Sequence, residues 1–462
     1  MSFRFNNTGC LCLLLAGVAA GCMTHRPGPD PLPAVTPSSF REAPAETPSG
    51  DLPAPWWTSL NDPVLGGLID VALAGNLNLD RFVARVRQAH ARWQKAGGEL
   101  LPTLDGTGEV NARTRSKGKP SQTTALGVMW NWEIDVWGRL TSVRDAESQD
   151  MIAARWDLEA ARLFLSAAVA QTYFEILEQS LQLNLLRRQN SVNATLLDLT
   201  RLRFGQGQVS IVDVYQQRAQ VAATDSRVPE IESRLEQLEY ALDDLLGQGG
   251  GTRQRRIAPL LPVLNNPLSP GVPSDLLIHR PDLVAVQNRM RAIDHRIGEA
   301  LADRLPRFRI GGLLQGEGSP SIDGLLASAV ADFVGPIIDG GTRRAEVNLR
   351  RAQLDELLAE YSQSYLTAVR EVETALLQER KSVERGKRLH EELDIANKLL
   401  TETRNRYSQG VLTEYLPVLD AVSRVQILER EVITNERERI GFRVALHRAI
   451  GGPMPANEEE RK

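Results

Sequence analysis

Two stretches in the first half of the chain alternate between polar and apolar residues, which is the period of a β-strand with one wet and one apolar face. They cover about residues 101–113 and 124–133. The alternation returns in the second half over about 306–316, and a weaker version follows over about 325–334. We therefore predict four strands of about ten residues, a length that crosses a bilayer when the strand is tilted.

A helical spacing of apolar residues follows each pair of strands and lasts far longer than in an average helix. From Trp156 to Arg203 the pattern covers roughly 70 Å at 1.5 Å per residue. Two apolar seams on adjacent flanks suit a helix with neighbours on both sides, as in a ring; an ordinary bundle core is the alternative. The seams are Leu163, Ala167, Ala170, Phe174, Leu177 and Leu181, and Leu165, Val169, Thr172, Ile176, Gln179 and Leu183.

The second half of the chain repeats the first, because four blocks recur in the same order at an offset of 203 or 204 positions. Each half should therefore contain a helix, two strands, a very long helix, a glycine turn and a further long helix. Residues 101–104 match 305–308, and residues 203–207 match 406–410. The pair Asp135 and Arg139 matches the pair Asp339 and Arg343. The block of Ala241, Leu242 and Gly247 matches the block of Ala445, Leu446 and Gly451.

The start of the chain indicates export from the cytoplasm. Arg4 precedes an apolar run from Leu11 to Ala20, which is the pattern of a secretory signal and is too short to span a bilayer. Val18-Ala19-Ala20-Gly21-Cys22 resembles a bacterial lipobox, so we expect Cys22 to be lipidated. A plain signal that leaves Cys22 as an incidental thiol is the alternative.

These features divide the chain into six parts. Residues 24–55 contain nine prolines and little apolar material, which indicates an extended tether and not a packed domain. The predicted parts are a signal peptide at 1–21, a lipidated tether at 22–55, a first repeat at 56–246, a linker at 247–280, a second repeat at 281–452 and a tail at 453–462.

Composition and motifs argue against catalysis and nucleic-acid binding. The net charge of −4 disfavours a nucleic-acid partner. The six histidines show no metal-binding spacing, and the GQGGGT segment at 247–252 lacks the ending of a phosphate-binding loop. The acid pair Asp243-Asp244 should be solvated on a charged helix face. We expect no catalytic residue, no metal and no cofactor.

The plan of the chain resembles the outer membrane factor family, the TolC-like and OprM-like exit ducts of Gram-negative efflux and type I secretion systems. The resemblance covers nearly everything from Trp56 to Gly452. The motifs that carry it are Trp56-Trp57 with Asp62-Pro63, Trp132-Glu133-Ile134-Asp135 with Gly138-Arg139, LLIHRPD at 276–282, IDHRIG at 293–298, and Pro336 with Asp339-Gly340-Gly341. Together they resemble the lipidated, OprM-like branch, in which an arginine usually stands at the position of His279.

The resemblance implies a mostly α protein with a small β part. Long coiled-coil helices would form a trimeric α-barrel, and each protomer would add four strands to a shared 12-stranded transmembrane β-barrel. The function would be that of an outer membrane channel in a tripartite efflux pump, passively conducting drugs, metals or other small molecules. The partners would be two further copies, a periplasmic adaptor (membrane fusion) protein, an inner-membrane transporter such as an RND pump, and outer membrane lipids.

By the same resemblance, two groups of residues carry the function. At the strand-to-helix junctions, Trp130 and Trp132 would lie at the membrane interface, where indole prefers to be. Asp135 and Asp339 would cap the long helices, and Gly138, Gly340 and Gly341 would relieve the backbone there. At the periplasmic tip, the expected pore constriction is Asp213, Leu416 and Asp420. The expected adaptor contacts are Arg203, Gly207, Arg406, Gln409 and Gly410.

Several alternatives remain open at this level. Asp213 and Asp420 could instead be exposed residues at helix starts, stabilised by the helix N-terminus. Pro417 and Leu412 replace an aspartate and an arginine that some relatives carry at the tip. The chain could serve a type I protein secretion system, or it could be a periplasmic coiled-coil lipoprotein that forms no pore.

Overall fold

The computed structural model describes residues 25, 26, 28, 33, 36–42, 55–113, 121–249, 259–264, 268, 270–318, 322–412 and 414–453. The chain divides into two compact units, and each is described by itself. The first unit takes its described residues from the stretch up to Ala34, from Phe82–Asp157 and from Asp282–Gln363. The second takes them from Val35–Arg81, Leu158–Pro281 and Ser364–Lys462.

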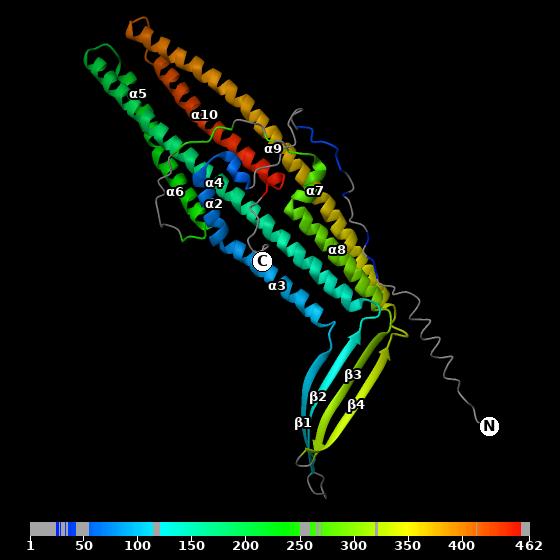
Figure 1. Cartoon of the computed structure of the whole chain (residues 1–462). Helices are drawn as coiled ribbons and strands as arrows, with labels where there is room; N and C mark the ends of the chain where they lie inside the picture. Colours follow the sequence, from blue (N-terminus) through cyan, green and yellow to red (C-terminus); the bar gives the residue numbers. More distant parts are fainter. Residues whose placement is uncertain are drawn as a thin grey trace, which may run out of the picture. The chain divides into compact units, whose positions relative to one another are not determined.

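The two halves of the chain carry the same series of elements (Figure 1), which confirms a mostly helical fold with four strands and an internal duplication. The first half contains η1 (Trp56–Leu60), α2 (Pro63–Gly75), α3 (Leu77–Gly98), β1 (Thr103–Arg113), β2 (Ser121–Ile134), α4 (Arg139–Gly205), α5 (Ile211–Asp225) and α6 (Val228–Leu245). The second contains η2 (Pro273–Asp275), α7 (Leu276–His279), α8 (Pro281–Ala302), β3 (Arg307–Gly318), β4 (Ile322–Val334), α9 (Thr342–Ser408) and α10 (Leu416–Ala449).

The four strands form one antiparallel sheet in the order β1-β2-β3-β4 (Figure 1). In each ladder, the start of one strand lies against the end of its neighbour, as in the pair Arg307 and Val334. Glycine permits close packing inside the sheet: a Cβ on Gly312 would lie 2.5 Å from the indole nitrogen of Trp130. β4 begins at Ile322, earlier than its weak alternation predicts, because its ladder with β3 extends to the pair of Gly318 with Ile322.

α4 and α9 each contain 67 residues, which corresponds to about 100 Å of helix. Both predicted seams of α4 are covered by other elements of the same chain: Leu163 and Leu177 of one seam and Val169 and Ile176 of the other belong to one buried cluster. A core within one chain therefore accounts for these positions without a ring. Within the described residues, no helix combines the length and the hydropathy needed to cross a bilayer.

The helix that returns after α4 is interrupted, contrary to the expectation of one long helix in each half. α5 ends at Asp225 and α6 begins at Val228, with Pro229 in its first turn. Proline lacks an N–H and its ring collides with the carbonyl four residues earlier, so a helix cannot run through this point undisturbed. α10 has its proline, Pro417, in the first turn, where it is tolerated, and continues unbroken to Ala449.

The core of the second unit is built around the first aromatic motif. Trp56 is fully buried, and its indole nitrogen donates to the Ser166 hydroxyl at 3.0 Å. The ring of His447 lies 5.3 Å from the Trp56 ring, and its Nε2 is 3.0 Å from the Ser59 hydroxyl. Burial and, to a smaller extent, the nearby Arg443 guanidinium lower the pKa of His447 to about 3. This histidine is therefore neutral in the folded protein.

The motif at 276–282 also lies against the end of α10. Arg280 is buried, donates to the Ala449 carbonyl at 3.2 Å and forms an ion pair with Glu371 at 2.7 Å. Gly451 takes a φ of +74°, and a Cβ there would lie 2.5 Å from the His279 carbonyl oxygen. The side chain of His279 is exposed, so the replacement of the usual arginine changes the surface only.

The described residues of the N-terminal segment dock on helices. In the first unit, Asp294 of α8 accepts hydrogen bonds from the His25 ring at 2.9 Å and the Gly28 N–H at 2.9 Å. In the second unit, Glu373 of α9 accepts from the backbone N–H groups of Arg41 and Glu42. The segment contains no helix or strand in its described residues, and these contacts hold those residues against the helices.

The acid pair near the end of α6 differs from expectation at one position. Asp243 is only 4 % exposed, whereas Asp244 faces solvent. The end of α6 packs into the core through Leu242 and Leu246. Asp243 is buried because it lies next to Leu242 on this part of the helix. The prediction that both carboxylates are solvated is therefore wrong for Asp243.

The neutral state of His447 predicts a pH dependence of stability. An unfolded histidine titrates near pH 6.5, so between about pH 6.5 and 3 the unfolded chain binds a proton that the folded chain does not. Stability should therefore fall as the pH falls through this window, by at most about 1.4 kcal/mol per pH unit from this group. His447→Gln cannot titrate and should lower that slope in urea unfolding of the detergent-solubilised protein. The exposed His390→Gln is the control, and equal slopes for all three proteins would contradict the assignment.

Candidate functional site

The first strand-to-helix junction joins β2 to α4 and is held by Asp135. Its carboxylate accepts from the N–H groups of Leu140 at 3.0 Å and Thr141 at 2.7 Å, so it caps the first turn of α4. Gly138 takes a φ of +72°, which a residue with a side chain adopts only at a cost. Arg139 then donates twice to the same oxygen of Glu133, at 2.8 and 3.0 Å, and ties the helix start to the end of β2.

The second junction joins β4 to α9 with the same chemistry. Asp339 accepts from the N–H groups of Gly341 at 2.9 Å and Arg343 at 3.2 Å. These two hydrogen bonds lower the pKa of Asp339 below its usual range, because they stabilise the carboxylate. Gly340 and Gly341 both have positive φ, at +63° and +86°. The two junctions thus repeat an aspartate cap, a left-handed glycine and an arginine.

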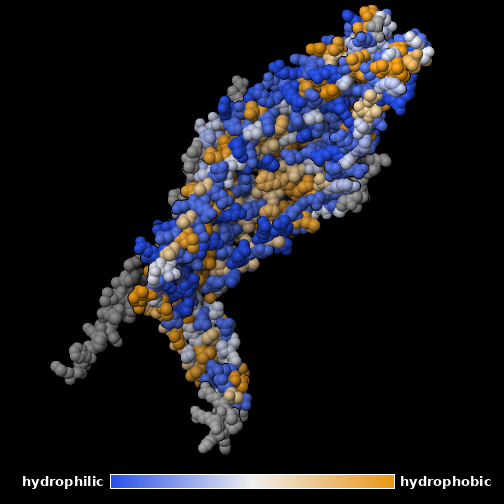
Figure 2. All heavy atoms as spheres, turned by 180° about the vertical axis from the view of Figure 1, so that it is seen from behind, coloured by the Kyte–Doolittle hydropathy of each residue, from blue (hydrophilic) through white to orange (hydrophobic). Residues whose placement is uncertain are grey.

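Aromatic side chains gather at the end of the sheet nearest these junctions. Trp132 donates from its indole nitrogen to the Leu100 carbonyl at 2.9 Å, and Trp137 donates to the Pro306 carbonyl at 2.7 Å. The ring of Phe308 lies 6.3 Å from Trp137 and 5.5 Å from Phe333. Figure 2 shows apolar residues interspersed with polar ones over the strands. Tryptophan rings at one end of a sheet, such as those of Trp132 and Trp137, are typical of a membrane–water interface.

The glycine turns at the far ends of α4 and α9 share one geometry. Gly207 and Gly410 have φ of +71° and +76°, the left-handed conformation that ends many helices. In each turn the N–H that follows the glycine donates back to a carbonyl of the last helical turn, that of Arg203 or that of Arg406, at 2.9 Å. A Cβ on either glycine would meet nothing within 4 Å, so their surfaces are open. Gln409, beside Gly410, is exposed.

The two tips of the chain are in contact. The guanidinium of Arg203, in the last turn of α4, lies 5.0 Å from the centre of the Tyr407 ring on α9. Tyr407 in turn lies 5.4 Å from the Tyr415 ring. The Tyr415 hydroxyl donates to the Gln217 side chain of α5 at 2.9 Å, and burial raises the pKa of that hydroxyl. A cation–π contact and a buried hydrogen bond therefore join the two helix hairpins.

Buried amides continue this connection away from the tip. Gln217 donates to the Asn193 carbonyl at 2.8 Å, and Asn193 donates to Thr224 at 2.9 Å. Gln426 donates to the Asn193 side chain at 3.0 Å. Polar contacts of this kind fix which side chains face each other, because an unpaired buried amide is costly.

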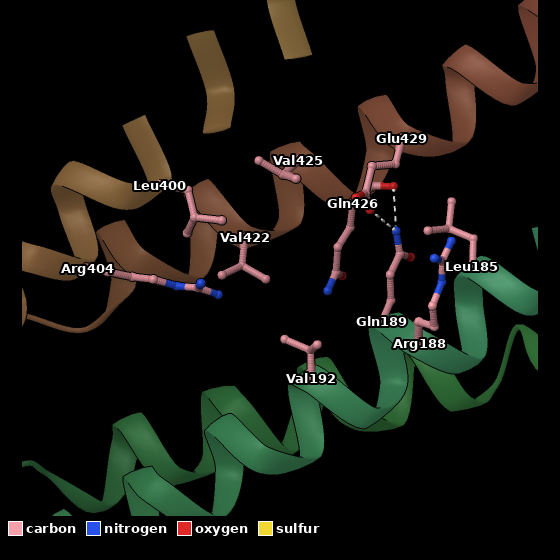
Figure 3. A pocket seen from close by; sticks show the side chains of 10 residues that line it. All are labelled: Leu185, Arg188, Gln189, Val192, Leu400, Arg404, Val422, Val425, Gln426 and Glu429. Carbon is pink, nitrogen blue, oxygen red and sulfur yellow. Dashed lines mark hydrogen bonds between the residues drawn. The ribbon is translucent and has the colours of Figure 1, made fainter. Parts of the chain in front are cut away.

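A hollow of about 260 Å³ opens between α4, α9 and α10 beside these amides (Figure 3). Gln189 reaches across it from α4 and donates to the Gln426 carbonyl at 3.1 Å and to Glu429 at 2.7 Å, both on α10. Leu400 and Val422 supply apolar walls. The hollow is open to solvent and carries none of the residues predicted for the site.

The residues predicted for the constriction differ in their surroundings. Leu416 is 45 % exposed at the start of α10, and Asp420 is exposed one turn later. Asp213 instead closes a capping box: its carboxylate accepts from the Ser210 N–H at 2.8 Å, while the Ser210 hydroxyl accepts from the N–H groups at the start of α5. That geometry matches the alternative of a helix-start residue for Asp213.

Some site residues were not singled out from the sequence. Tyr407 and Tyr415 flank the second glycine turn, and their places within recurring motifs were the available signal. Glu133 and Trp137 hold the first junction, but sequence alone does not show which partners they meet.

Cys22 lies outside the described residues. Within the described residues, no group of three histidine, cysteine, aspartate or glutamate side chains could hold a metal ion.

Comparison with known proteins agrees with this architecture. One solved structure, a membrane protein from Pseudomonas aeruginosa, superposes with a TM-score of 0.85 at 26 % identity, and the match covers 93 % of this chain and 100 % of that chain. The pyoverdine export outer membrane protein OpmQ of Pseudomonas putida is 28 % identical over 98 % of this chain and 99 % of its own length. The toluene efflux pump outer membrane protein TtgF of Pseudomonas putida is 29 % identical over 86 % of this chain and 85 % of its own.

The family profile described as "Outer membrane efflux protein" matches twice, over residues 68–248 and 272–452. Each match contains two strands and one 67-residue helix, so the sequence profile and the structure describe the same duplication. The family consists of channels and not enzymes. The chain therefore belongs to the outer membrane efflux protein family and is an outer membrane channel of an efflux pump.

Proposed function

We propose that three copies of this chain form the exit duct of a tripartite efflux pump, with a shared 12-stranded barrel in the outer membrane and a helical tunnel in the periplasm. One observation carries the proposal: among the residues that the structure describes, β1 and β4 each pair on one side only, so the four-stranded sheet has two open edges. Unpaired backbone groups are not tolerated in lipid, and four strands are too few to close a barrel. Copies must therefore share strands.

The length and surface of the strands support a membrane location. β1 to β4 contain 11 to 14 residues, enough to cross a bilayer at a tilt. Large apolar side chains point outward from the sheet, for example Leu126 and Leu325. The aromatic rings at the junction end mark the periplasmic interface in this arrangement. α4 and α9 then extend from that interface into the periplasm.

The anchor that we propose is a lipid on Cys22. Cys22 directly follows the segment Val18-Ala19-Ala20-Gly21, and the five residues together resemble a lipobox. A lipid chain next to the sheet would hold the N-terminal segment at the same membrane as the strands.

The proposed cargo is a small molecule delivered by an inner-membrane transporter, such as an RND pump, through a periplasmic adaptor. The relatives named for pyoverdine export and for toluene efflux support this class over secreted proteins. The duct has no energy source of its own in this proposal, so transport through it is passive. The adaptor would dock at the open glycine turns near Gly207 and Gly410, with Arg203, Arg406 and Gln409 beside them.

The proposed constriction lies at the start of α10. In a trimer, Leu416 and Asp420 would each appear three times around the axis. A leucine ring excludes water and ions sterically and by dewetting, and an aspartate ring concentrates negative potential that favours cations. The exposure of both side chains in one copy supports a position facing a lumen. Asp213 contributes less in this proposal, because its carboxylate is engaged in the capping box.

The purified mature protein should form trimers that resist SDS and that conduct ions ohmically in planar bilayers. The reason is that only a shared barrel satisfies both sheet edges. Gel mobility with and without boiling and single-channel recording measure this, with boiled protein as the control. A stable monomer without conductance would contradict the proposal and would support a coiled-coil lipoprotein without a pore.

Asp420→Asn should lower the cation preference of the channel roughly twofold, because it removes three negative charges from one ring. The reversal potential in a salt gradient measures the change. Asp70→Asn removes an exposed carboxylate from α2 and is the matched control. If both variants keep the wild-type reversal potential, Asp420 does not face the permeation path.

Gly410→Leu should abolish transport in cells without lowering trimer abundance, because a bulky side chain at the tip blocks the close approach of an adaptor helix. Gly410→Ala separates the effect of side-chain size from that of backbone strain. In both variants the left-handed conformation costs roughly 1 kcal/mol, but only leucine adds a large side chain. The alanine variant should keep most of the activity. Gly67→Leu, on the exposed side of α2, controls for added surface hydrophobicity. Wild-type export by Gly410→Leu would refute docking at the tip.

A further inference from the structure

The turn between β4 and α9 carries two unusually exposed isoleucines. Ile337 is 96 % exposed and Ile338 is 91 % exposed, more than any other large apolar side chain among the described residues. The next residue is Asp339, whose carboxylate is held charged by backbone N–H groups. The charge of Asp339 disfavours burial of this turn in lipid, and the two apolar side chains disfavour its exposure to water. A protein surface that covers the isoleucines satisfies both requirements.

The equivalent turn of the first half shows what is missing. There, Trp137 packs against Phe308 and donates to the Pro306 carbonyl, so a residue of the β2-to-α4 turn is covered by the chain around the start of β3. Among the described residues, β4 has no strand on its outer side, because it is an edge of the sheet. The isoleucines are therefore exposed where a further strand start would lie.

The start of β1, at the opposite edge, presents matching apolar residues. Leu101 is 65 % exposed and Leu104 is 73 % exposed. β1 runs away from the helices and β4 runs back toward them, so β1 of a second copy placed beside β4 would continue the antiparallel order. In the ladders within the chain, Thr103 pairs with Asn131 near the end of β2, and Arg307 pairs with the last residue of β4. A fourth ladder of this kind brings the start of β1 beside the end of β4.

We propose that Ile337 and Ile338 of one copy pack on Leu101 and Leu104 of the next copy, and that this apolar contact sets the register between copies. The inference rests on the proposed function in so far as copies must share a sheet. Backbone hydrogen bonds between strands are independent of sequence, and a slip of one residue exchanges the two faces of a strand. Side chains must therefore specify the register. These four are among the exposed apolar residues at that end of the seam, where Phe333 and Val334 at the end of β4 are exposed as well.

Cysteine pairs test the contact. Leu101→Cys and Ile338→Cys in one chain lie at opposite edges of the sheet, about 14 Å apart across three strand spacings, which is too far for a disulfide. Oxidation should therefore link neighbouring copies and yield covalent oligomers on non-reducing gels. Leu101→Cys with Leu325→Cys is the matched control, because Leu325 is exposed on the same edge strand but at its other end. The control pair should give at least tenfold less product.

A second variant tests the energetic role. Ile337→Asp combined with Ile338→Asp should reduce SDS-resistant trimers at least tenfold, whereas Ile395→Asp with Leu399→Asp, two exposed residues of α9, should not. Two results would contradict the proposed contact while leaving the shared sheet intact. In the first, wild-type trimers form but only the pair of Leu101→Cys with Leu325→Cys cross-links. In the second, the variant with both Ile337→Asp and Ile338→Asp keeps its trimers. Complete modification of Ile338→Cys by a membrane-confined maleimide without cross-linking would show that lipid covers the turn and would also overturn it. Absence of wild-type trimers would instead refute the proposed function.

Discussion

The two unpaired edges of the β1–β4 sheet are the constraint on which the rest of the molecule depends. Each edge strand carries backbone N–H and carbonyl groups that neither water nor a neighbouring strand can satisfy inside a bilayer. A single chain offers no fifth strand among its described residues. In the proposed function, strands of other copies complete the sheet, and its exposed apolar residues at both edges are then surfaces for those copies or for lipid.

The transition from sheet to helix imposes a second requirement, which the chain meets twice with the same residues. Where a strand leaves the sheet and a 67-residue helix begins, the backbone must change from the extended to the helical conformation within a few residues. An aspartate caps the new helix, and a glycine takes the conformation that other residues avoid. Because the duplication preserves both devices, the two long helices begin at equivalent positions of the sheet.

At the other end of the helices, polar contacts join the two hairpins beside an apolar cluster that includes Leu400 and Val422. Arg203 lies over Tyr407, Tyr415 binds Gln217, and amides continue the contact through Asn193 and Gln426. Such contacts discriminate strongly between alternative alignments but contribute modestly to net stability. These contacts give the tip a defined geometry, and in the proposed function a partner displaces the hairpins from it.

The sequence by itself determined the four strands, the duplication, the glycine turns, the aspartate caps and the family, because periodicity, turn conformation and capping are encoded within a few neighbouring residues. Even the break at Pro229 was locally encoded, although the helical pattern around it concealed the interruption. Only the tertiary structure decided that Asp243 is buried, that the N-terminal segment docks on Asp294 and Glu373, that one chain covers both seams of α4, and that Ile337 and Ile338 are exposed. These outcomes depend on which element lies beside another across hundreds of residues, and no local pattern carries that information.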